Sequence, residues 1–88
     1  MIYTLYISRF GKTFEKASYD GKRFPSWESE VLAYRYRDTW VRNHPNSIYF
    51  LAVVPTLVGG PMALSWYDVL DSVGRQRIRR VSNGKIVD

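Results

Sequence analysis

Arginine is concentrated near the carboxyl-terminal end of the chain, where it could serve the binding of anions. Residues 75–88 hold five cations and one carboxylate, Asp88, and so carry +4 of the chain's net charge of +5. The guanidinium group of arginine binds phosphates and carboxylates in a forked geometry that lysine lacks. The cations of this segment are Arg75, Arg77, Arg79, Arg80 and Lys85.

Three of these arginines alternate along the chain. If residues 75–81 form a strand, Arg75, Arg77 and Arg79 point to the same side of it, because side chains in a strand alternate with a period of two. Such a row can contact successive phosphates or an acidic protein surface. The alternative is a solvated edge strand whose arginines prevent association with other sheets.

The dipeptide Asn83-Gly84 is typical of a two-residue β-hairpin turn. It would pair Val81 with Ile86, and Val81 lies on the strand face that Arg77 and Arg79 share. Burial of that pair would draw the arginine stems toward the edge of the core, with their charged ends in water. A helix that continues through Gly74 is the competing structure, but the turn signal favours the hairpin.

A second mixture of aromatic and basic side chains lies in residues 26–43, which the sequence predicts to be a helix. Ser26 is placed to cap this helix, and His44-Pro45 ends it. We identify four candidate binding residues in it, because aromatics and arginine dominate binding hot spots and bases stack on aromatic rings. These residues are Arg35, Tyr36, Trp40 and Arg42.

The apolar residues of this helix form two opposite stripes, whereas a surface helix normally needs only one. Either the helix is sandwiched between two layers, or one stripe contacts a partner, which includes a second copy of the chain. One stripe holds Trp27, Val31, Tyr34 and Val41, and the other holds Leu32, Ala33, Tyr36 and Trp40.

His44 is the only histidine, and Asp38 lies six residues before it. A histidine near arginines and tyrosines is able to carry general acid–base cleavage of RNA. The same residues also form an ordinary helix stop, and we predict that the protein is not an enzyme. No catalytic residue is therefore assigned.

Several classes of site are not expected. Cysteine is absent, which excludes disulfides, thiolate zinc sites and a cysteine nucleophile. No metal site is predicted, because Glu28, Glu30 and Asp38 are explained as helix-start and surface charges, and the pair Asp68 and Asp71 alone is a poor magnesium site. No cofactor is predicted either, since Gly59-Gly60 lacks the residues of a phosphate-binding loop. No apolar run approaches the roughly 20 residues that span a membrane, so we expect a cytoplasmic protein without a membrane partner.

The 88 residues favour one compact domain over residues 1–88, with the basic hairpin at 75–88. We predict an α+β fold: an antiparallel sheet of four or five strands, with one long helix packed on a face and one short helix. The expected order is strand, strand, helix, strand, helix, hairpin. It uses strands near residues 2–7, 13–19 and 48–54 and a short helix over 66–73. The expected core is Leu5, Ile7, Val31, Tyr34, Phe50, Ala52, Val54, Leu70 and Val73.

Two functions are consistent with this pattern. The first is a non-enzymatic binding module for an anionic partner, either nucleic acid or an acidic surface of a nucleic-acid-handling protein complex, through the basic C-terminal segment. The second is a small inhibitor or adaptor of the phage or mobile-element type, which docks on a host or defence protein. Its anchors would be the aromatic helix stripe and the loop 55–61, with Leu57 and Val58 at the loop tip.

Overall fold

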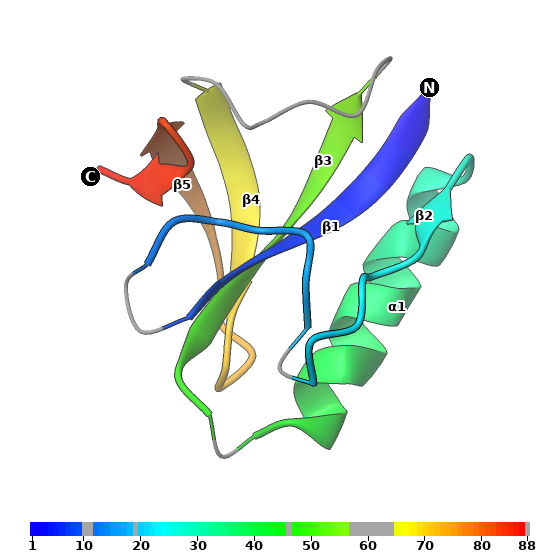
Figure 1. Cartoon of the computed structure of the whole chain (residues 1–88), viewed down its shortest axis with the longest axis horizontal. Coiled ribbons are helices and arrows are strands. Elements are labelled where there is room, and N and C mark those ends of the chain that lie inside the picture. The colour runs from blue at the N-terminus through cyan, green and yellow to red at the C-terminus, as the bar shows by residue number, and fades with distance from the viewer. Residues whose placement is uncertain (10–11, 19, 46, 57–64, 88) are drawn as a thin grey trace.

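The computed structural model describes residues 1–9, 12–18, 20–45, 47–56 and 65–87 as a curled antiparallel sheet with one helix. The spatial order of the six strands is β2-β1-β3-β4-β5-β6, and every neighbouring pair is antiparallel. Figure 1 shows that the sheet curls and that α1 lies along one side of it. In chain order the elements are β1 (Ile2–Arg9), β2 (Ser26–Trp27), α1 (Glu30–Asn43), β3 (Tyr49–Thr56), β4 (Ser65–Asp71), β5 (Gln76–Ser82) and β6 (Lys85–Ile86).

The predicted fold class is wrong. The structure is a mostly antiparallel sheet of six strands, curled into a half-barrel, and among the described residues it contains a single helix. The predicted second helix over 66–73 is β4 and the turn after it. The predicted strand over 13–19 is not regular, because its described residues form only the isolated bridges of Glu15 with Ile7 and of Ala17 with Arg23.

Residues 65–71 form a strand because they pair with a neighbouring strand on each side. Leu70 pairs with Leu51 of β3, and Val69 pairs with Arg77 of β5. Trp66, Tyr67 and Val69 are residue types that favour strands. The helix signals in this segment are local, and the ladders on both sides outweigh them.

Two other strand predictions and the hairpin are confirmed. β1 and β3 lie where the sequence places them, and β3 is central, between β1 and β4, with both faces packed. Val81 pairs with Ile86 across the turn, and the backbone N–H of Val87 donates to the carbonyl of Arg80 at 3.0 Å. Residues 76–82 are therefore a strand and not a helix.

The helix starts three residues later than predicted. Ser29 caps it, since its hydroxyl accepts from the backbone N–H of Leu32 at 3.3 Å, and Ser26 instead belongs to β2. The helix is also not sandwiched between two layers, because Val31 and Leu32 are 60% and 50% exposed. A single face of α1 is buried, and it consists of Ala33, Arg37, Trp40 and Val41.

The two faces of the sheet carry separate cores. The helix-side cluster joins Trp40 and Val41 of α1 to Leu5, Leu51 and neighbouring strand residues. The opposite face carries an inner cluster without any helix residue: Tyr6, Phe14, Ala52, Val54, Val69 and Val81. The side chains of β5 that face the inner cluster therefore lie on the face of the sheet opposite to α1.

Residues 12–18 cross the inner face, as Figure 1 shows. Glu15 bridges to Ile7 of β1, and the backbone N–H of Phe14 donates to the carbonyl of Gly84 at 2.6 Å. This segment therefore links β1 to the last hairpin and partly closes the curl, with the Phe14 ring buried beneath it.

Most of the predicted core is buried, with two clear exceptions. Val31 is on the exposed face of α1, and Val73 is 69% exposed because it lies in the β4–β5 turn and not in a helix. Tyr34 and Phe50 are half-buried. The remaining predicted core residues, which are Leu5, Ile7, Ala52, Val54 and Leu70, are buried.

Within the described part of the chain, no helix has both the length and the apolar character that crossing a membrane requires.

Candidate functional site: an arginine-lined hollow

Three of the predicted binding arginines line one hollow of about 280 Å³ on the inner face of the sheet. Arg77 and Arg79 come from β5 and Arg75 from the turn before it. Phe50 of β3 and Val69 of β4 form the apolar part of its lining, and Asp71 is its carboxylate. We call this site the arginine hollow: Phe50, Val69, Asp71, Arg75, Arg77 and Arg79.

Strand register explains why these side chains meet. Val69 pairs with Arg77, Tyr67 with Arg79 and Phe50 with Asp71, and partners in an antiparallel sheet project from the same face. Val69 belongs to the inner cluster, so its partner Arg77 must also be on the inner face. The predicted common direction of Arg77 and Arg79 agrees with this register.

Asp71 shapes the turn that carries Arg75. Its Oδ1 accepts from the backbone N–H groups of Val73 and Arg75 at 3.1 and 2.9 Å, and its Oδ2 accepts from Nε of Arg75 at 2.9 Å. Burial by itself raises the pKa of the Asp71 carboxyl. The hydrogen bonds from Arg75 and Val73 and the charge of Arg75 outweigh burial and hold that pKa below its ordinary value of 3.8. The carboxylate thus stays charged and neutralises part of the hollow.

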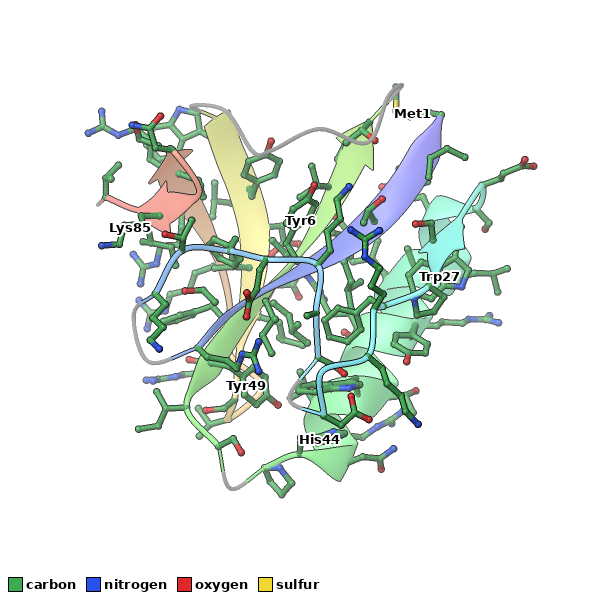
Figure 2. All side chains as sticks on the ribbon, in the orientation of Figure 1. Met1, Tyr6, Trp27, His44, Tyr49 and Lys85 are labelled. Carbon is green, nitrogen blue, oxygen red and sulfur yellow. The ribbon has the colours of Figure 1, made fainter. Side chains whose placement is uncertain are left out.

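The other two cations of the basic segment lie elsewhere. Arg80 is exposed and pairs with Trp66, and it points to the opposite face of the sheet from its neighbours Arg79 and Val81. Lys85 lines a more open depression with Lys12, Thr13 and Glu15. Figure 2 shows Lys85 on the opposite side of the molecule from Trp27. The basic segment is therefore divided between three places.

The two helix arginines do not join the arginine hollow, because α1 covers the other face of the sheet. Arg35 is exposed on α1. Arg42 donates to the hydroxyl of Thr39 at 3.3 Å, and it borders a depression with Asp38, Leu70 and Gln76.

The helix aromatics Tyr36 and Trp40 meet in a separate pocket of about 360 Å³, which Ser18 and residues of the segment 20–24 also line. Trp40 is only 8% exposed, and its ring packs against Phe24 and Tyr49 at centroid distances of 5.7 and 4.9 Å. It is therefore part of the core and not an exposed anchor. The other predicted anchors, Leu57 and Val58, lie outside the described residues.

His44 closes the same pocket at the end of α1, where Figure 2 labels it. Its ring stacks on Trp40 at 3.8 Å between centroids, and its Nδ1 donates to the Trp40 carbonyl at 2.8 Å. Asp38, the carboxylate that the sequence places nearest, forms an ion pair with Arg37 instead.

Asp20 shares the pocket, and the Ser18 hydroxyl and then the Lys22 backbone N–H hold its pKa below the ordinary value. His44 and Asp20 thus each contact residues close to them in the chain.

Sequence reasoning missed two important residues. Phe50 was expected only as core, and nothing in its own segment shows that it faces the arginines. Arg37 is only 2% exposed, although arginine is a residue type that is rarely buried. Its Nη1 donates to the Asp68 carbonyl at 3.2 Å, and its guanidinium lies 4.6 Å from the centroid of the Tyr34 ring. Arg37 therefore connects α1 to β4 and is not available to a ligand.

No protein-family model, curated protein or solved structure matches the chain, so its function must be inferred from its own residues. Among the described residues, no three histidine or acidic side chains lie close enough together to hold a metal ion.

Proposed function

We propose that this protein is a non-enzymatic binding module that engages nucleic acid through the arginine hollow. The observation that carries the proposal is the convergence of Arg75, Arg77 and Arg79 on one hollow, where Asp71 is the only carboxylate among the described lining residues. Guanidinium groups bind phosphates through charge-assisted hydrogen bonds, and phosphate contacts supply most of the sequence-independent affinity for nucleic acids.

The lining of the hollow favours nucleic acid over an acidic protein surface. Phe50 and Val69 provide an apolar wall directly beside the cations, and Tyr67 is a half-buried neighbour on the same face. A nucleotide offers a phosphate and a flat apolar base at adjacent positions, which fits such a lining. An aspartate or glutamate side chain offers the charge alone. A location in the cytoplasm, where nucleic acids are accessible, is part of this proposal.

The proposal is tested by fluorescence anisotropy with labelled heteropolymeric DNA and RNA, and with labelled polyglutamate as an acidic polypeptide. The double variant Arg77→Ala/Arg79→Ala should lose most of the affinity for nucleic acid. The matched control is Arg35→Ala/Arg80→Ala, which removes the same charge from exposed positions outside the hollow and should bind nearly as the native protein does.

Salt dependence provides the second readout. If Arg77 and Arg79 neutralise two phosphates of a single strand, they contribute roughly −1.4 to the slope of log affinity against log salt. The slope of the native protein should therefore be steeper than that of Arg77→Ala/Arg79→Ala by this amount. Equal losses in both double variants would show a diffuse charge effect and would contradict a site in the hollow. Tighter binding of polyglutamate than of nucleic acid would assign the hollow to an acidic protein.

A further inference from the structure

We infer that the arginine hollow selects single-stranded over duplex nucleic acid by stacking one unpaired base on Phe50. This inference rests on the proposed function and names its ligand class. Phe50 lies on β3, where its neighbours in the ladders are Ser8 of β1 and Asp71 of β4. Its ring is half-buried and packs against the inner cluster, while the rest of its surface lines the hollow.

That position makes Phe50 a fixed platform. The ring loses little conformational entropy on binding, because it already packs against the inner cluster. Arg77 and Arg79 reach the same hollow from β5, two strands away in the sheet order. Aromatic rings and guanidinium planes both stack on nucleobases, and arginine also binds the adjoining phosphates.

The size of the hollow argues against a duplex. A volume of about 280 Å³ is slightly smaller than the usual range of ligand pockets, so the hollow suits part of one nucleotide and not a double helix. In a duplex each base is paired and stacked, so a base can enter the hollow only after flipping out, at a cost of a few kcal/mol. A duplex therefore offers the arginines its phosphates alone, whereas a single strand offers phosphate and base together.

The stacking contact on Phe50 predicts little preference for base sequence. Of the six described residues that line the hollow, two are apolar and three are cationic, and among these six Asp71 is the only side chain that can accept a hydrogen bond from a base. Its oxygens already accept from Arg75 and Val73. Stacking is tolerant of sequence, because every base has a π face.

The test compares the native protein with Phe50→Leu, which keeps an apolar side chain and removes the aromatic face. The probes are labelled single-stranded oligonucleotides of about 12 nucleotides, in DNA and RNA form, and a duplex of the same length, read by anisotropy. The native protein should bind the single strands more tightly. Phe50→Leu should weaken single-strand binding by roughly 5- to 150-fold, the range that one stacked base supplies, and leave duplex binding unchanged.

Two further variants keep the result interpretable. Phe50→Tyr retains the ring and should retain the preference for single strands. Trp66→Leu makes a similar aromatic-to-leucine change at a side chain that is 62% exposed on the other face of the sheet, and it should change nothing. Thermal unfolding of each variant establishes that it is folded before binding is compared.

The outcomes separate this inference from the proposed function. Equal affinity of the native protein for single strands and duplex, or an equal loss for both probes in Phe50→Leu, overturns base stacking while the arginine variants still define a nucleic-acid site. Absence of binding to every nucleic-acid probe overturns both proposals.

Discussion

Nε of Arg75 donates to Oδ2 of Asp71 at 2.9 Å, across the turn that joins β4 to β5. The other oxygen of the same carboxylate accepts from two backbone N–H groups of that turn. One side chain therefore has two effects: it fixes the turn, and it offsets one of the three positive charges of the arginine hollow. Removal of the Asp71 carboxylate should therefore lower the stability of the protein and raise its affinity for anions.

Asp71→Asn tests this opposition. Asparagine can still accept from the turn backbone, but the charge is lost, so we expect a loss of stability of about 1 kcal/mol, the difference between charged and neutral hydrogen bonds. Affinity for single-stranded nucleic acid should rise, with a salt slope steeper by up to roughly 0.7, because Arg75 then becomes available to a phosphate. Anisotropy titrations at several salt concentrations measure both quantities.

The control for this variant is Glu28→Gln, an equal charge change at an exposed residue between β2 and α1. It should raise the affinity much less than Asp71→Asn does. Weaker binding by Asp71→Asn would mean that the shape of the turn matters more to the ligand than the charge of the hollow.

The lowered pKa of Asp71 predicts an acid-labile turn. Because the folded state holds this carboxyl below the value of 3.8, its stabilising contribution is present above about pH 3.8 and is lost as the pH falls through the folded pKa. Asp71→Asn cannot undergo this loss. Urea unfolding of both proteins should therefore show a stability difference that is largest near neutral pH and shrinks in strong acid. A difference that is independent of pH would exclude the carboxylate as its cause.

The sequence predicts features of this fold that are set locally. Asn83-Gly84 fixes the last hairpin and its register, and the buried run of β3 places that strand in the middle of the sheet. The sequence predicts a helix in place of β4 because Ser65 is a residue type that caps helices, Asp68 is favoured near a helix start, and Gly74 is typical of a helix end. Pairing with β3 on one side and with β5 on the other decides its structure, and the residue pattern of the segment itself does not show that pairing.

The same distinction applies to the site. The common side of Arg77 and Arg79 follows from strand alternation, so the sequence predicts it. That Phe50 joins them depends on the registers of β3 with β4 and of β4 with β5. No local pattern contains this information. The burial of Arg37 cannot be predicted from a local pattern either, because its partner Asp68 is 31 residues away in the sequence.

Arg37 should be more important to stability than any other arginine of α1. Arg37→Met keeps the buried stem and removes the hydrogen bond to the Asp68 carbonyl, so we expect a loss of roughly 2–3 kcal/mol in urea unfolding. Arg35→Met, at an exposed position of the same helix, should change stability by about 0.5 kcal/mol or less. Equal effects of the two variants would show that the buried contacts of Arg37 contribute little.

Tyr34 provides an independent readout of the same contact. Burial, followed by the charge of Asp68, raises the pKa of Tyr34 above 10.0, and the charge of Arg37 opposes both. Arg37→Met should raise that pKa further, which ultraviolet titration of the tyrosines can follow. A fall in the pKa would mean that the pocket around Tyr34 opens to water when Arg37 is replaced.

Gly84 should tolerate a side chain less well than Gly74. Both have positive φ, at +77° and +84°, so alanine costs about 1–2 kcal/mol in backbone strain at either position. A Cβ at Gly84 would also lie 2.6 Å from Cγ2 of Thr13, whereas a Cβ at Gly74 meets nothing within 4 Å. Gly84→Ala should therefore be the less stable variant by roughly 1–3 kcal/mol, the usual range for overpacking. Equal thermal stabilities would mean that residues 12–18 are not held tightly against the last hairpin.

Substitution of His44 tests the proposal that the protein is a non-enzymatic module. His44→Ala removes the stack on Trp40 and the hydrogen bond to its carbonyl, so stability should fall by about 1–2 kcal/mol, with oligonucleotide affinity unchanged. His44→Phe keeps an aromatic ring on Trp40 and should recover part of that stability, although it cannot transfer protons. The decisive measurement is incubation of all three proteins with labelled RNA. We expect no cleavage by any of them. Cleavage by the native protein that both variants lack would make His44 a catalytic residue and refute the proposal.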